Sequence, residues 1–153
     1  MKRKRGIILT SVLAGLAVIA IAGFFLVRAA EDRVTADFVN RVDRFSVPAN
    51  WPLESGIVRR EMFLCMDTNP CPSIYRRWNV GGEFTADDLK AVSNTAGVTM
   101  SVKGTCARPA DAGGVTTACS ASGNDGEYDY TLKVVSPGKN NPLTLVLTAE
   151  PHR

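Results

Sequence analysis

The sequence predicts an α+β protein: a single N-terminal transmembrane helix, then a small external domain with two helices on a mainly antiparallel sheet. Three observations support this fold class. An uncharged apolar stretch follows a basic tail, two later segments show helical apolar spacing, and the C-terminal half alternates apolar and polar residues. The chain of 153 residues is long enough for one domain with a modest core.

The first 27 residues have the pattern of a signal anchor. Residues 1–5 form a basic tail, and residues 6–27, GIILTSVLAGLAVIAIAGFFLV, carry no charge. This length crosses a bilayer core as a helix, and it exceeds the apolar core of about 7 to 15 residues in a cleaved signal peptide. Basic flanks stay on the cytoplasmic side, so we expect the N-terminus in the cytoplasm and residues 28–153 outside the cell membrane. The alternative is secretion after signal cleavage near Ala29.

The charge distribution argues against binding to nucleic acid. The formal net charge is +3, but four of the eighteen Lys and Arg residues lie in the tail. The other fourteen Lys and Arg residues are balanced by fifteen Asp and Glu residues, so the external part is nearly neutral. A nucleic-acid-binding domain needs a basic surface on its folded part. The absence of an Asn-x-Ser/Thr acceptor fits a bacterial envelope protein.

Residues 28–56 are expected to form a juxtamembrane helix and a connector. Val34, Phe38, Val42 and Phe45 make one helical stripe, which could continue from the membrane span. We expect the stripe to cover one face of the domain, and a juxtamembrane dimer helix is the alternative. The connector SVPANWPLESG contains Trp51, which we expect to seat the connector on the core.

Residues 57–153 are expected to form the external domain. Segments 57–65 and 73–80 are predicted as strands of a hairpin around the turn sequence DTNP. Thr85 is a predicted N-cap for a helix that Gly97 ends. Further strands are predicted in four segments: 98–103, 115–121, 127–134 and 143–148.

Four cysteines lie in the part of the chain expected outside the membrane, where disulfides form. The spacings C-x5-C and C-x12-C lack the close pairs of structural zinc sites and the C-x-x-C of thiol oxidoreductases. We favour two structural disulfides, Cys65–Cys71 at the neck of the first hairpin and Cys106–Cys119 across the second turn-rich loop. Crossed pairing remains open.

The most suggestive binding constellation lies on the first predicted hairpin. Two arginine doublets beside aromatic residues would form a small basic patch able to hold an anionic glycan, a phosphate or an acidic protein surface. The alternative is that the arginines pair with Glu61, Glu83 and Asp87 on a solvated face. The candidate binding residues are Arg59, Arg60, Tyr75, Arg76, Arg77 and Trp78.

The sequence offers little for catalysis. Histidine-based hydrolysis needs a positioned imidazole, and the sole histidine, His152, lies at an end we expect to be frayed. Carboxylates around the first hairpin are typical solvated groups, and SGNDGEYD at 122–129 fits a hairpin turn better than a calcium loop. We therefore expect no catalytic residues, no metal and no cofactor.

Together these features favour a non-enzymatic, single-pass envelope protein. Its expected partners are the lipid bilayer and a protein or cell-wall component, with no nucleic acid, and its oligomeric state is open. The alternative is a membrane-tethered enzyme or thiol-disulfide accessory that uses Cys65 and Cys71.

Overall fold

In the residues that the structure describes, the protein combines two helices with one six-stranded antiparallel sheet, as the fold class predicted. The computed structural model describes residues 2–63, 65, 71–108, 114–138 and 141–152, with the backbone alone for residues 2–11. The order of elements along the chain is one long helix, a hairpin, a short helix and four further strands.

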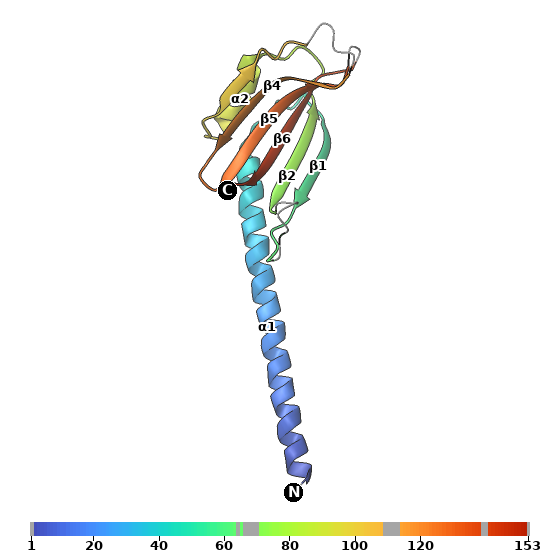
Figure 1. The fold of residues 1–153 in the computed structure, drawn as a ribbon, viewed down its shortest axis with the longest axis vertical. Coiled ribbons are helices and arrows are strands. Elements are labelled where there is room, and N and C mark those ends of the chain that lie inside the picture. The colour runs from blue at the N-terminus through green and yellow to red at the C-terminus, as the bar shows by residue number, and fades with distance from the viewer. Residues whose placement is uncertain (1, 64, 66–70, 109–113, 139–140, 153) are drawn as a thin grey trace.

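Helix α1, Lys2–Val42, is one uninterrupted helix of 41 residues. At about 1.5 Å per residue it is about 60 Å long. Its apolar window is long enough to cross a bilayer, and none of that window is buried inside the protein. Figure 1 shows α1 projecting from the domain as a rod, with only its C-terminal end behind the sheet. The expected juxtamembrane helix is therefore a direct continuation of the candidate membrane span.

The sheet places its first two strands at one edge. Its strands are β1 Leu53–Arg59, β2 Ser73–Asn79, β3 Ser101–Gly104, β4 Thr116–Asn124, β5 Tyr128–Ser136 and β6 Thr144–Pro151. They lie in the order β1-β2-β6-β5-β4-β3, and every neighbouring pair is antiparallel. Pairing of β2 with β6 therefore joins the first hairpin to the C-terminal meander.

The first strand starts earlier than its sequence pattern indicated. β1 begins at Leu53, inside the expected connector, and ends at Arg59 instead of Cys65. The connector contributes because Leu53 pairs with Trp78 and the backbone amide of Asn79 donates to the carbonyl of Pro52 at 3.0 Å. The hairpin connection is consequently longer than predicted, and it spans residues 60–72.

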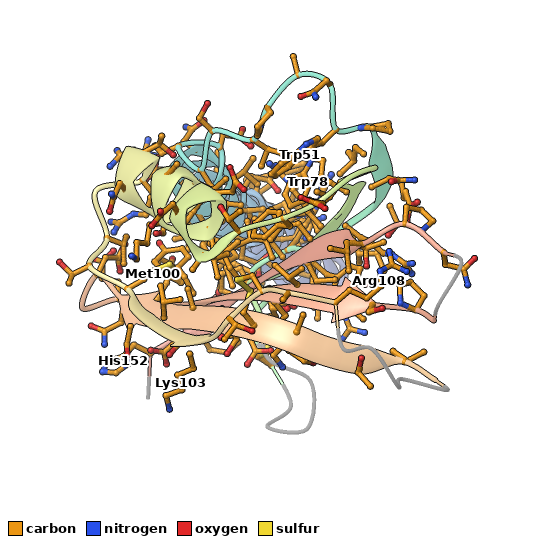
Figure 2. The ribbon with its side chains drawn as sticks, turned by 90° about the horizontal axis from the view of Figure 1, so that it is seen from above. Trp51, Trp78, Met100, Lys103, Arg108 and His152 are labelled. Atoms are coloured by element: carbon orange, nitrogen blue, oxygen red, sulfur yellow. A yellow bond between two sulfur atoms is a disulfide. The ribbon has the colours of Figure 1, made fainter. Side chains whose placement is uncertain are left out.

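The core lies between the sheet and a layer of helix on one of its faces. Figure 2 shows α1 and α2 on the same side of the sheet, and the side chains of Trp51 and Trp78 lie on that side as well. Phe38, Val42 and Phe45 from the predicted stripe are buried, whereas Val34 remains partly exposed. From the sheet, alternate residues of β5 and β6 complete the core: Tyr130, Leu132, Val134, Leu145, Leu147 and Ala149.

Helix α2, Ala86–Thr95, begins as its sequence predicted. Thr85 accepts a hydrogen bond from the backbone amide of Asp88, whose carboxylate in turn accepts from the amide of Thr85, which completes a capping box. Leu89 and Val92 are buried against the sheet. The helix ends before Gly97, which adopts a left-handed backbone with φ of 71°.

Candidate binding site

The structure separates the arginines that the sequence grouped together. Arg76 points to the helix side and pairs with Asp43 at 2.6 Å, just beyond the end of α1. Arg60 lies after β1 and is 3.6 Å from Asp32 on α1. These two guanidinium groups therefore connect the first hairpin to the long helix. Both arginines form ion pairs, but their partners are Asp32 and Asp43 instead of the carboxylates named in the sequence analysis.

Four residues of the hairpin share the outer face of the sheet, away from the helices. Ile57 lies opposite Tyr75 across the β1–β2 pair, and Arg59 lies opposite Ser73. Arg77, next but one to Tyr75, places its Nε 3.0 Å from a carboxylate oxygen of Glu54. We call this group, Ile57, Arg59, Tyr75 and Arg77, the outer hairpin surface.

Trp78 belongs to the core. It is 8% exposed and lies on the helix side of β2, one position from the outer hairpin surface in sequence but on the opposite face. Alternation along a strand causes this separation. Of the candidate binding residues, Tyr75, Arg59 and Arg77 remain together, while Arg60, Arg76 and Trp78 are placed elsewhere.

β1 is the more open edge of the sheet. Every residue of β1 is exposed, including the apolar Leu53, Ile57 and Val58. The opposite edge, β3, is only four residues long and carries Lys103. A bulge after Leu53 disturbs the distal end of β1, but residues 55–59 pair regularly with β2. An edge strand with unpaired backbone groups and apolar side chains is a template for adding another strand.

The cysteines pair in the way favoured by the sequence. Cys65 bonds to Cys71, and Cys106 bonds to Cys119. The first bond lies within the 60–72 connection, not at the neck between the two strands, because β1 ends six residues before Cys65. The second bond joins two buried residues and fixes the segment after β3 against β4.

An ionic cluster that the sequence did not indicate attaches α1 to the turn between β4 and β5. Arg41 donates to Asp125 at 2.9 Å, also pairs with Glu127, and lies over the ring of Tyr128. Tyr130 donates its hydroxyl to Asp125 at 2.8 Å. Because Arg41 and Asp125 are 84 positions apart, only the folded arrangement reveals their contact.

The pKa of Asp125 reflects this cluster. Burial acts to raise the pKa, but hydrogen bonds from the amide of Tyr128, the hydroxyl of Tyr130, the amide of Glu127 and the guanidinium of Arg41 favour the charged form. Together the hydrogen bonds lower the pKa to about 2. The SGNDGEYD segment therefore forms a turn, as predicted, in which Asp125 accepts hydrogen bonds.

Several groups with potential for acid-base chemistry line a groove beside α1. The groove has a volume of about 640 Å³ and is lined in part by Glu61, Tyr128 and His152. Burial raises the pKa of Glu61, and the charge of Glu31 raises it further. The expected fraying of His152 is wrong, because its amide donates to the carbonyl of Glu127 and its ring lies 2.8 Å from Asp129.

No protein-family model, curated protein or solved structure matches the chain.

Proposed function

We propose that this chain is a single-pass, membrane-anchored envelope protein whose external domain binds a partner protein without catalysing a reaction. The exposed apolar edge strand β1 carries this proposal. The apolar part of α1 supports the anchor, and two disulfides in one small domain support an external, oxidising location.

The exposed edge favours a protein over a cell-wall glycan as the partner. A strand added beside β1 would form backbone hydrogen bonds with its unpaired groups, and it would contact side chains on both faces of the sheet. Ile57 and Tyr75 on the outer face and Val58 on the helix face would then provide side-chain specificity. Arg59 would add a charge at the rim, where electrostatics influences partner choice.

Crosslinking from neighbouring positions tests this geometry. A photoreactive amino acid at position 57 or at position 58 should join the same partner protein in intact cells, because an added strand lies beside both faces. The matched control is position 103 on the opposite edge, which should give no such product. Capture from 57 but not from 58 would contradict strand addition and indicate a ligand on the outer hairpin surface. Absence of protein products from both positions would contradict the proposal.

The thiol-disulfide alternative is tested separately. Under the binding proposal, the purified protein has no free thiols and Cys65–Cys71 resists mild reduction. A bond that is readily reduced, together with a thiol of lowered pKa at either position, would favour the alternative.

A further inference from the structure

Residues 60–63, which follow β1, lie along the helix just above its apolar stretch. The backbone amide of Phe63 donates to Glu31 at 2.8 Å, and that of Glu61 donates to Thr35 at 3.0 Å. Arg60 pairs with Asp32 on the same part of α1. Figure 1 shows this segment descending beside α1 from the end of β1. We call residues 60–63 the strap.

The strap presents large apolar side chains to solvent. Phe63 is 84% exposed and Met62 is 50% exposed. The backbone of this segment is nevertheless held in place, because its hydrogen bonds to Glu31 and Thr35 fix it against the helix. Two apolar side chains are thus held beside the helix with half or more of their surface exposed.

The height of the strap corresponds to the lipid headgroup layer. Val27 is the last residue of the uncharged stretch, and Glu31 is four residues further along. This separation is about 6 Å along a helix. The headgroup layer on each side of the hydrocarbon core is about 5 to 8 Å thick, so a residue hydrogen-bonded to Glu31 lies within that layer.

We propose that Met62 and Phe63 insert into the headgroup and acyl-chain boundary of the bilayer that α1 spans. This inference depends on the membrane anchor of the proposed function. Apolar side chains at this boundary bury about 5 to 10 Å deep in peripheral membrane proteins. Arg28, on the same part of α1, pairs with Glu31 at 3.2 Å, and its side chain is 43% exposed, so its guanidinium group can also contact lipid phosphates. The domain therefore has two membrane contacts, α1 and the strap, which fix its orientation.

Depth-dependent fluorescence quenching tests the insertion in the full-length protein. The variant F63W is reconstituted in phosphatidylcholine and phosphatidylglycerol vesicles that contain lipids with a spin label at a shallow or a deep acyl carbon. The matched control is V115W, which also replaces an exposed apolar residue. Val115 directly precedes β4, whose first residue, Thr116, lies opposite Ser136 at the end of β5. The other end of β5 is Tyr128, whose ring stacks on Phe38 of α1. The two ends of β5 are about 27 Å apart, so Val115 lies far from α1 and the strap.

The two native tryptophans are present in every variant, so the comparison between variants removes their contribution, and they lie away from the strap. Trp78 pairs with Leu53 at the end of the hairpin away from the strap, and Trp51 precedes Leu53 in the chain. We expect emission from F63W to be shifted to the blue relative to V115W, and to be quenched more by the shallow label than by the deep label. V115W should be quenched by neither. M62W provides a second variant and should behave like F63W.

Flotation of the same vesicles separates the two proposals. Protein that fails to float with the lipid would overturn the anchor itself, and with it the insertion. Protein that floats, with tryptophan at 62 and 63 no more quenched than at 115, would overturn the insertion alone and assign the strap to water or to a protein partner.

Discussion

Asp125 gathers four hydrogen-bond donors on one carboxylate. Its Oδ1 accepts from the amides of Glu127 and Tyr128, and its Oδ2 accepts from Arg41 and Tyr130. A charged acceptor satisfied on both oxygens stabilises the fold only while it stays ionised. This single residue therefore makes the attachment of α1 to the sheet dependent on pH.

The pH dependence has a definite direction. The pKa of Asp125 is about 2 in the folded protein against 3.8 for an ordinary aspartate. A lowered folded pKa means that the stabilisation is present above pH 3.8 and is lost as the pH falls from there toward 2. A shift of this size corresponds to about 2 kcal/mol before solvent screening, which reduces it because Asp125 is an exposed residue.

The variant D125N should therefore be less stable than the native protein at pH 7 and should lose less stability between pH 5 and pH 2. Chemical denaturation at several pH values measures both effects. D87N is the control, because Asp87 pairs with its helix neighbour Lys90 at the surface and should change the profile little. An acid profile of D125N parallel to that of the native protein would contradict the assignment.

At the scale of elements, the two disulfides differ in what surrounds them. Cys106 and Cys119 are buried, and their bond closes a loop with a sequence separation of 13. Cys65 is exposed, and its bond spans a separation of 6. Chain entropy assigns about 3 kcal/mol to the longer loop and about 2 kcal/mol to the shorter, and the lost core packing increases the difference.

We expect the variant C106A/C119A to lower the melting temperature clearly more than C65A/C71A. Thermal melts of both variants under the same conditions provide the comparison. Equal losses would show that neither loop length nor burial determines the contribution of these bonds.

The capping box of α2 gives a smaller, local prediction. T85A removes the side-chain acceptor for the amide of Asp88 and should cost about 1 kcal/mol of unfolding free energy. T85S keeps a hydroxyl at this position and should retain most of that stability. Denaturant titration of the two variants tests the assignment, and an equal loss in both would indicate that the methyl group matters instead of the cap.

Elements with a strong local signal were predictable, and contacts between distant segments were not. The apolar stripe of α1, the Thr85 cap and the alternation in β5 and β6 all express the local rules of helices and strands. β1 was misplaced because prolines and a glycine made residues 46–56 resemble a connector. Pairing with β2, which is a non-local contact, determines that Leu53 begins a strand.

In the candidate site, too, the local pattern was predictable and the contacts between distant segments were not. Alternation correctly placed Tyr75 and Arg77 on one face and Arg76 and Trp78 on the other. It did not reveal which face the helices cover, and therefore could not show that Trp78 is buried. The strap and the Arg41 cluster depend on α1 passing behind the sheet, which no local pattern in the sequence specifies.

At the scale of the whole molecule, the basic tail should determine the topology. Replacing the four basic residues at 2–5 with asparagine should reduce the fraction of chains whose domain lies outside the membrane. Protease protection measures the orientation, and alkylation of free thiols gives a second readout, because a domain retained in the cytoplasm would lack its disulfides. Unchanged orientation and fully formed disulfides would contradict the assigned role of the tail.

Because α1 continues without a break into the core, its length sets both the height of the domain above the apolar stretch and the rotation of the domain about the helix axis. One alanine inserted after Ala29 lies below every contact of the strap, so it would turn the whole domain by about 100° and raise it by about 1.5 Å. Seven inserted residues would restore the original facing to within about 20° and raise the domain by about 10 Å. The first change would disturb which neighbours β1 faces, and the second would withdraw Phe63 from the lipid while leaving that facing nearly intact.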